Sequence, residues 1–188
     1  ALIIFVAFLG LNPGTEQELF SMEQLIEAFT LERIGKAGAR FDIQKAQWFN
    51  QHYLRSKPED VLMGYLFDSL KKENIDCSQE KAKKIVAVMK ERVTFPKDFW
   101  EQGKFFFIAP VSFDEQVVTK KWSDDAVKVL TAFSHEIKSK DNLTAGLAKD
   151  TLEMVTSKLG MKSGQILQVL RMSVTGGASG PDLMMTLE

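Results

Sequence analysis

The sequence has little of what marks several large classes of protein. Cys77 is the single cysteine among 188 residues, which excludes an internal disulfide and a zinc site built on cysteines, and we expect it to be a small packing residue. Lysine and arginine total 24 against 25 aspartate and glutamate residues. The formal net charge of -1 provides no global basic field, so any contact with nucleic acid must depend on local charge and shape.

A long hydrophobic run is also missing. Residues 1–9 are almost wholly apolar, but a membrane-spanning helix needs about 20 such residues. The segment also lacks the basic n-region and the small-residue cleavage site of a signal peptide. We interpret it as a buried helix of a chain that continues upstream, and we expect no membrane partner.

Three common catalytic motifs are absent as well. These are the phosphate-binding Gly-x-x-x-x-Gly-Lys loop, the dinucleotide-binding Gly-x-Gly-x-x-Gly turn and the Gly-x-Ser-x-Gly turn of hydrolases. His52 and His135 are far apart and lack the spacing of paired metal ligands. We therefore predict no catalytic residue and no metal ligand in this chain.

Helical spacing and helix start signals recur, whereas strand patterns are scarce, so the predicted fold class is all-α. Ser21 and Gln24 have the spacing of a capping box, Asp42 and Ser78 are suitable N-caps, and Pro58 suits the first turn of a helix. The predicted helices cover residues 21 to about 30, 42–54, 58 onward, 78–92, 124–138, 144–159, 164–174 and 181 onward.

No repeat of fixed period is present, so we expect an irregular superhelical stack of helices rather than a regular solenoid. We divide the chain into residues 1–20, 21–108 and 109–188. Residues 93–113 are predicted to form an irregular, packed connection between two helical subdomains.

Two stretches combine residue types that suit contact with RNA. In the first, Lys45, Trp48 and His52 are spaced three and four residues apart, so they share one helical face. In the second, Arg171 lies on a helix that ends at a glycine-rich turn beside another helix start. Splayed bases need such cations, N–H groups and apolar surface together, although a glycine-capped helix end with an exposed arginine explains the second stretch as well. Large aromatic side chains usually serve packing, so we expect Trp48 and Tyr53 in the core.

Both stretches resemble signatures of the bacterial glutamyl-tRNA synthetase family, in its C-terminal anticodon-binding region. The first resembles F-D-x-x-K-x-x-W-x-N-x-x-Y, and the second resembles G-x-x-x-G-x-x-x-x-x-L-R-x-x-x-T-G followed by proline and leucine. The matching residues are Phe41, Asp42, Lys45, Trp48, Asn50, Tyr53, Gly160, Gly164, Leu170, Arg171, Thr175, Gly176, Pro181 and Leu183. Val169 and Met184 depart from the pattern, since the family often has proline at the first position and can have an aromatic residue at the second. The resemblance covers essentially the whole chain.

The resemblance implies part of an enzyme that joins glutamate to its tRNA with ATP. Residues 1–20 would be the tail of the catalytic and stem-contact region, and residues 21–108 and 109–188 two helical anticodon-binding subdomains. The family's His-x-Gly-His and Lys-Met-Ser-Lys-Ser motifs are absent from this sequence. The resemblance therefore implies that ATP and Mg²⁺ bind in a missing catalytic domain, and that this fragment has no cofactor and no catalytic activity of its own. It also implies tRNA(Glu) as partner, a monomeric state and a cytoplasmic location.

The resemblance further implies which residues contact tRNA. Arg92 corresponds to the arginine that inspects the last anticodon base, where arginine indicates discrimination between glutamate and glutamine tRNAs. A guanidinium fork suits hydrogen bonding to a base edge. Arg171 and Leu183 correspond to positions that meet the first anticodon base, and Thr175 and Met184 lie beside them in the motif.

Several cations are further candidates. Lys45 and His52 are candidate tRNA contacts on the first motif. Lys81, Lys83 and Lys84 are candidate phosphate contacts, for which an ordinary solvated helix face is the alternative interpretation.

Two alternative functions stay open. A helical protein-interaction module that binds no RNA fits the slight net acidity. The tail of a class I lysyl-tRNA synthetase would share the helical architecture, although residues 41–53 favour glutamate. Salt-dependent binding to an anticodon stem-loop separates the first alternative from a tRNA-binding role, because phosphate contacts make affinity fall steeply with salt.

Overall fold

The computed structural model describes residues 1–35 and 40–188, and in these residues the chain is helical with no β-strand. An isolated antiparallel bridge joins Leu11 to Ile34. The helices are α1 Leu2–Phe8, α2 Met22–Ala28, α3 Ile43–Arg55, α4 Glu59–Lys72, α5 Gln79–Met89, α6 Asp98–Glu101, α7 Glu115–Lys121, α8 Asp124–Lys138, α9 Ala145–Lys158, α10 Ser163–Thr175 and α11 Leu183–Leu187. Leu31–Arg33 and Lys104–Phe106 form single turns of 3-10 helix. The all-α prediction is confirmed.

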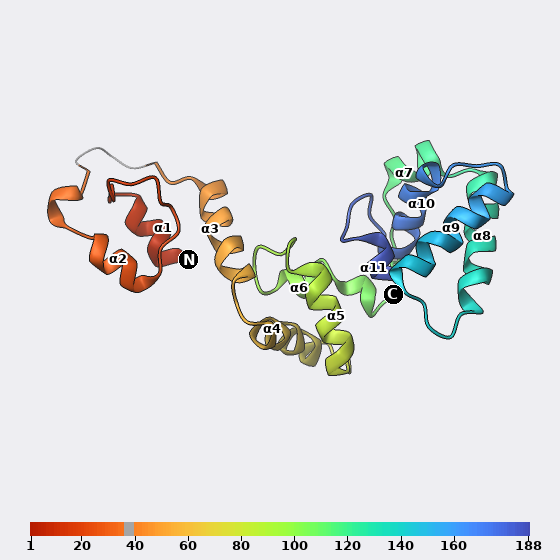
Figure 1. Cartoon of the computed structure of the whole chain (residues 1–188), viewed down its shortest axis with the longest axis horizontal. Helices are drawn as coiled ribbons and strands as arrows, with labels where there is room; N and C mark the ends of the chain where they lie inside the picture. The colour runs from red at the N-terminus through yellow and green to blue at the C-terminus, as the bar shows by residue number, and fades with distance from the viewer. Residues whose placement is uncertain (36–39) are drawn as a thin grey trace.

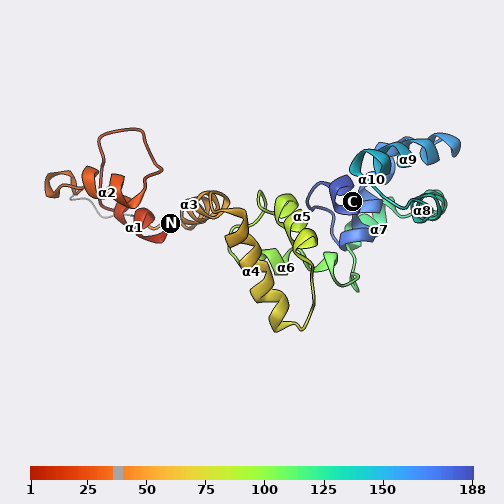
Figure 2. The ribbon, with the colours of Figure 1, turned by 60° about the horizontal axis from the view of Figure 1, so that its bottom comes forward.

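The helices form three regions in an irregular row along the long axis of the molecule (Figure 1). The N-terminal region contains α1–α3, the middle region α4–α6 and the C-terminal region α7–α11, and Figure 2 shows the same order after a rotation. Each region has its own core of buried apolar side chains. These are Ile4, Phe5, Leu11, Phe20, Leu25 and Phe49 in the N-terminal region; Leu54, Leu62, Leu66, Leu70, Ala82, Ile85, Val86, Met89, Val93 and Phe99 in the middle region; and Val117, Ala126, Val129, Phe133, Leu152, Val155, Ile166, Val169, Leu170, Met172 and Leu183 in the C-terminal region. The division after residues 20 and 108 stays a prediction.

Side-chain caps start the helices where the sequence predicts them. Ser21 Oγ accepts the N–H of Gln24 at 3.2 Å, and Gln24 Oε1 accepts the N–H of Ser21 at 2.8 Å, which completes the capping box. Asp42 Oδ1 accepts the N–H of Lys45 at 3.1 Å, and Ser78 caps α5. Because these bonds satisfy N–H groups that the helix leaves free, they define the starts of α2, α3 and α5.

The end of α5 differs from the prediction. The helix ends at Met89, whereas the sequence pattern extends it to Arg92. The buried carboxylate of Asp98 accepts the N–H groups of Thr94 and Phe95 at 2.8 and 2.9 Å, which holds the chain in a bend a few residues after α5 and prevents the helix from continuing. Arg92 lies in the turn between α5 and this bend, where its N–H donates to the carbonyl oxygen of Met89 at 2.8 Å, and not on the helix.

The connection between the middle and C-terminal regions contains more helix than expected. Residues 93–113 include α6 and a 3-10 turn. Directly after them lies α7, which the sequence pattern does not predict, because seven residues are too few to establish a period. Asp114 starts α7 by accepting the N–H of Val117 at 3.0 Å.

Two predictions about apolar side chains in the N-terminal region need correction. In α1, Ile4 and Phe5 are buried but Leu2 is 70% exposed, so the helix is buried on one face only, the face that packs against α3. Trp48 is 42% exposed, and the prediction that it lies in the core is wrong. The neighbouring Phe49 fills that position on the core side of α3 and is fully buried.

Tyr53 and Cys77 behave as packing residues. Tyr53 is half-buried against the N-terminal core, and its hydroxyl donates to the carbonyl oxygen of Phe20 at 2.6 Å and accepts the N–H of Phe20 at 3.0 Å. This pair of bonds ties α3 to the segment before α2. Cys77 packs against the middle core just before α5, and burial raises the pKa of its thiol above the ordinary value.

Candidate nucleic-acid interface

The C-terminal end of α10 is fixed by Gly176. This residue has a left-handed backbone with φ of 80°, and its N–H donates to the carbonyl oxygen of Met172 at 2.7 Å. Its own carbonyl accepts the N–H of Asp114 at 2.9 Å, and a Cβ at this position would lie 2.8 Å from the carbonyl oxygen of Ser112. Glycine is therefore needed for both backbone conformation and close approach. The 177–182 loop follows Gly176 directly, and Gly176 is held against residues 112–114, which connect the C-terminal region to the middle region.

Arg171 and Thr175 lie one turn apart on α10 and hold this loop. Arg171 Nη1 donates to the carbonyl oxygen of Pro181 at 2.5 Å, which uses one of the five N–H donors of the guanidinium. The Thr175 hydroxyl donates to the carbonyl oxygen of Arg171 at 2.9 Å and accepts the N–H of Gly177 at 3.3 Å. The backbone of Gly180 passes so close that a Cβ there would lie 3.1 Å from Arg171 Nη1. The guanidinium of Arg171 thus has a hydrogen-bond partner within the protein, the carbonyl oxygen of Pro181.

Leu183 and Met184 begin α11 beside this arginine. Asp182 caps the helix by accepting the N–H of Met185 at 2.9 Å. Leu183 is buried in the C-terminal core, whereas Met184 is half-buried and lines a cavity of about 260 Å³ together with Leu183 and Arg171. Sequence positions 171, 183 and 184 therefore converge on one surface, although Leu183 offers it little exposed area.

Arg92 faces the same loop from the other side. A cavity of about 240 Å³ is bounded by residues of the middle region and of the C-terminal region. The middle region contributes Met89, Arg92, Gln102 and Phe105 to its walls, and the C-terminal region contributes Thr175, Ser179, Gly180 and Pro181. We call it the loop cavity. Arg92 is exposed, so its guanidinium can reach a ligand that enters there.

Gln102 and Phe105 are among the residues of the loop cavity that the sequence does not predict as tRNA contacts. Gln102 and Phe105 offer an amide and an aromatic ring, both useful for binding a base. They lie in the segment predicted to be an irregular connection, where no periodic pattern shows which side chains face a cavity. The aromatic-rich composition of that segment is the one signal that points to them.

The three lysines on α5 proposed as phosphate contacts each have a neighbour within the protein. These are Lys81 Nζ and the carbonyl oxygen of Phe106 at 3.0 Å, Lys83 Nζ and Glu59 Oε2 at 3.6 Å, and Lys84 Nζ and Glu188 Oε1 at 3.2 Å. All three lysines are exposed, and exposed ion pairs are weak, so a phosphate can compete with these partners.

Lys45 and His52 lie away from the loop cavity. Both belong to α3 in the N-terminal region, which the middle region separates from α10 and α11 (Figure 1). Lys45 Nζ lies 2.6 Å from Glu18 Oε1, and the ring of His52 stacks on Trp48 with 5.9 Å between centroids. The structure does not bring these two residues together with Arg92 or Arg171.

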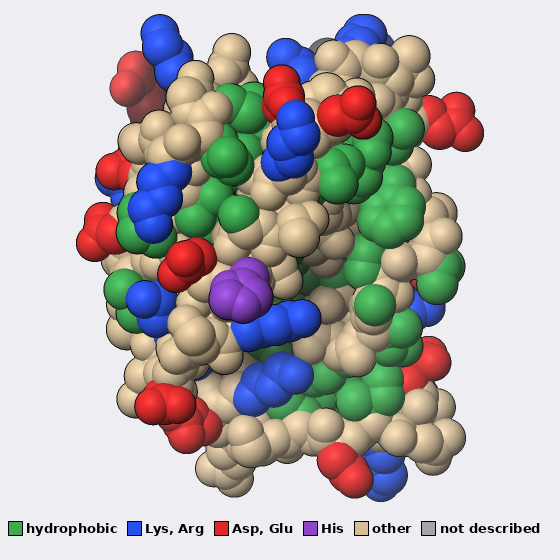
Figure 3. All heavy atoms as spheres, turned by 90° about the vertical axis from the view of Figure 1, so that its right-hand side faces the viewer, with side chains coloured by type: hydrophobic (Ala, Val, Ile, Leu, Met, Phe, Trp, Pro, Cys, Tyr) green, Lys and Arg blue, Asp and Glu red, His purple; other side chains and the backbone are tan. Residues whose placement is uncertain are grey.

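The charge distribution agrees with the near-zero net charge. On the outer face of the C-terminal region, lysine and arginine side chains alternate with aspartate and glutamate, without a uniform basic patch (Figure 3). Among the described residues, no three His, Cys, Asp or Glu side chains are grouped so that they could hold a metal ion. No helix within residues 1–35 and 40–188 is long and apolar enough to cross a membrane.

Comparison with known proteins decides the family. Residues 48–188 match the family model described as the anticodon binding domain. The chain belongs to this family. The anticodon binding domain model begins within α3, so it includes the loop cavity and all the predicted tRNA contacts except Lys45.

Curated relatives of this anticodon-binding chain are glutamate–tRNA ligases, which confirms the resemblance seen in the motifs. The ligase of Cytophaga hutchinsonii is 46% identical over 185 residues, covering 98% of this chain and 36% of the relative. That of Amoebophilus asiaticus is 45% identical over 188 residues, covering 100% and 37%. The crystal structure of the glutamate tRNA ligase of Elizabethkingia meningosepticum superposes with a TM-score of 0.87 at 39% identity, covering 98% of this chain and 37% of that one. This chain therefore spans little more than a third of the length of these relatives, and the matches favour neither alternative function.

Proposed function

We propose that this chain reads the anticodon of tRNA(Glu) as part of a glutamate–tRNA ligase. The observation that carries the proposal is the loop cavity, where Arg92 and the 177–182 loop, about 90 residues apart in sequence, bound one space. A guanidinium, an amide, an aromatic ring and backbone groups surround it. Such a set suits an unstacked base, which is recognised through its edge and its face.

In this proposal the chemistry of ligation lies outside this chain. Glutamate is activated with ATP and Mg²⁺ by the part of the enzyme that the longer relatives possess, and this chain contributes no catalytic residue. The role of this chain is to orient the tRNA by binding its anticodon arm. We also propose that it acts in the cytoplasm and as a monomer.

Arg92 is the proposed reader of the last anticodon base. Its side chain leaves the turn after α5 and is exposed at the wall of the loop cavity, so the planar fork can form two parallel hydrogen bonds to a base edge. Phe105 supplies an apolar wall for the face of the base, and Gln102 can donate or accept one further hydrogen bond.

A second base would contact the adjacent surface on α10 and α11. Arg171 keeps the 177–182 loop in place through Pro181 and retains further N–H donors, while Met184 provides apolar contact area. Thr175, at the end of α10, and Leu183, in the core, hold these groups in place. Lys45 and His52 are proposed as more distant contacts with the tRNA.

Substitution of Arg92 tests this function. We expect Arg92→Gln to bind a tRNA(Glu) anticodon stem-loop but to lose discrimination against a stem-loop in which the last anticodon base is changed from C, by about tenfold, since a specific base contact contributes about 1–3 kcal/mol. Fluorescence anisotropy at several salt concentrations measures both affinities, and thermal unfolding confirms that the fold is intact.

Lys72→Gln on the exposed end of α4 is the matched control, because it removes a cation away from the loop cavity. It should leave discrimination unchanged. Equal discrimination by Arg92→Gln and the parent would count against the proposed role of Arg92. No binding by the parent at low salt would count against anticodon reading by this chain.

A further inference from the structure

The middle and C-terminal regions meet across an interface that is partly hollow. A second cavity, of about 490 Å³, lies between α5 and α11. Ile85, Val88 and Phe105 line it on one side, and Val174 and Leu187 on the other. Because these apolar side chains leave the space between them unfilled, close packing alone does not fix the distance between the two regions.

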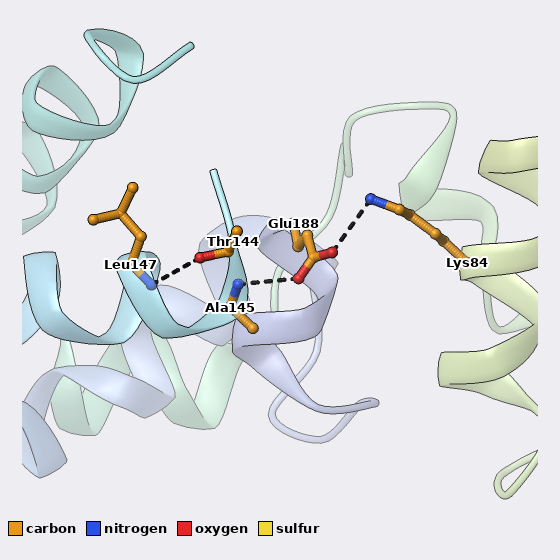
Figure 4. A network of polar contacts seen from close by, with 5 residues as sticks. All are labelled: Lys84, Thr144, Ala145, Leu147 and Glu188. Carbon is orange, nitrogen blue, oxygen red and sulfur yellow. Dashed lines mark hydrogen bonds and ion pairs between the residues drawn. The ribbon is translucent and has the colours of Figure 1, made fainter. Parts of the chain in front are cut away.

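Beside this cavity, the carboxylate of Glu188 joins the two regions (Figure 4). Its Oε1 lies 3.2 Å from Lys84 Nζ on α5, and its Oε2 accepts the N–H of Ala145, the first residue of α9, at 3.1 Å. The cap of α9 is formed separately, since Thr144 Oγ1 accepts the N–H of Leu147 at 3.2 Å. The two carboxylate oxygens are therefore held by two different regions, and a negative charge at a helix start is favourable.

The ionisation of Glu188 agrees with this arrangement. The hydrogen bond from Ala145, followed by the hydrogen bond and charge of Lys84, lowers the pKa of the Glu188 carboxyl below its ordinary value. The carboxylate is charged at neutral pH, as the ion pair with Lys84 requires.

The short helix α11 connects Glu188 to the candidate site. Arg171 holds the start of this segment at Pro181, and Leu183 anchors it in the core. From Leu183 to Glu188 the chain advances only about 8 Å, at 1.5 Å per helical residue. A displacement of Glu188 is therefore passed on to the residues that border the loop cavity.

We propose that Lys84 and Glu188 are a positioning pair for anticodon reading. By fixing α11 against α5, they keep Arg92 and the 177–182 loop on facing walls of the loop cavity. This inference rests on the proposed function of that cavity. The pair contributes little to the free energy of unfolding, because both side chains are exposed. Its effect is instead on the fraction of molecules whose two regions are arranged to bind, and apparent affinity falls with that fraction.

Glu188→Gln tests the pair by the direction of its effect. The substitution keeps the side-chain shape but removes the charge that holds Lys84. If Glu188 acted only as a negative charge near RNA, its loss would tighten binding to the anticodon stem-loop. The positioning role predicts that the dissociation constant rises by about fivefold, the lower end of typical coupling between sites. The salt dependence should stay as in the parent, because no phosphate contact is lost.

Glu101→Gln provides the matched control. Lys97 Nζ and Glu101 Oε1 are also 3.2 Å apart, but both belong to the segment around α6 and connect no two regions. This variant should bind RNA as the parent does. Lys84→Ala and the double variant complete a double-mutant cycle, in which Glu188→Gln should add no further loss once Lys84 is absent. The cycle separates the two possible roles of Lys84. If Lys84 acted only by contacting phosphate, the effect of Glu188→Gln would not depend on the presence of Lys84 in this way.

A distance measurement makes the inference testable without RNA. Spin labels at Lys71→Cys on α4 and Lys158→Cys on α9, in a Cys77→Ser background, report the separation of the two regions by pulsed electron paramagnetic resonance. We expect a broader distance distribution in Glu188→Gln than in the parent. An unchanged distribution overturns the positioning role.

The RNA results separate this inference from the proposed function. If the parent binds the stem-loop, an unchanged or lower dissociation constant for Glu188→Gln overturns the inference and leaves the function standing. An equally large loss of affinity in Glu101→Gln also overturns the inference. If the parent does not bind, the proposed function fails, and the distance distribution alone decides whether the pair fixes the two regions.

Discussion

The N-terminal and C-terminal regions are both helical, but they are stabilised differently. Among the residues that the structure describes, three of the six buried residues in the N-terminal core are phenylalanines, whereas the C-terminal core has eleven buried residues and one phenylalanine, Phe133. The N-terminal region also leaves Leu2, Ile26 and Leu31 more than 60% exposed. A few large rings thus hold the first region, and many interlocking aliphatic side chains hold the second.

This difference matters for where a binding site can be precise. In the C-terminal region, backbone hydrogen bonds and a packed core fix Arg171 and the 177–182 loop. In the N-terminal region, Lys45 and His52 have exposed side-chain neighbours, Glu18 and Trp48, as partners. A site for single bases needs rigid support, so the C-terminal region is the better scaffold for it.

The largest expected effects come from removing one ring in each region. Phe133→Ala and Phe49→Ala, both fully buried, should each lower the stability of their region by about 3–5 kcal/mol. Each region contains one tryptophan, so variants that keep only Trp48 or only Trp122 report urea unfolding of the two regions separately. If Phe133→Ala shifts the Trp48 transition as strongly as the Trp122 transition, the regions unfold as one unit and the contrast between them disappears.

A smaller effect is expected at the glycine that anchors the loop. Gly176→Ala should destabilise the protein by about 1–3 kcal/mol, because a side chain is strained at positive φ and would contact the carbonyl of Ser112. Thermal and urea unfolding measure the change. Gly164→Ala on the same helix is the control, since nothing lies within 4 Å of its added Cβ, and it should stabilise by up to about 1 kcal/mol. Similar stability changes at both positions would show that the loop is not anchored through Gly176.

The smallest effects are expected from substitution of one predicted tRNA contact in each of the two regions. Arg171→Ala should weaken binding to the anticodon stem-loop by about tenfold, because it loses a ligand contact and the bond that holds Pro181. Lys45→Ala should weaken binding less and lower the salt dependence instead, as expected for a phosphate contact. An unchanged dissociation constant for Arg171→Ala would leave that residue with the structural role alone.

The helical fold could be predicted from the sequence because its signals are local. Ser21, Asp42 and Ser78 each cap a helix within three residues of themselves, and the apolar period of the long helices extends over several turns. The end of α5 could not be predicted, since it depends on Asp98, nine residues beyond Met89. The exposure of Trp48 depends on which face of α3 packs against α1, which period alone does not determine.

The candidate site was predictable only in part. Arg171 and Thr175 are four residues apart on one predicted helix, so the sequence predicts that they lie together, and the family resemblance is what proposes them as tRNA contacts. Gln102 and Phe105 join the loop cavity through the packing of two regions, and Glu188 reaches Lys84 across 104 residues. No local pattern reports such contacts, because they depend on how the regions meet.

Each of the three cores is built from one continuous stretch of chain, residues 4–53, 54–107 and 117–187. During synthesis on the ribosome, the regions can therefore fold one after another, each as its own segment emerges. The loop cavity is an exception, because one of its walls belongs to the middle region and the other to the C-terminal region. A nascent chain can thus complete its first two cores long before the loop cavity exists, and the surface proposed to bind the anticodon forms only when residues 175–188 have emerged.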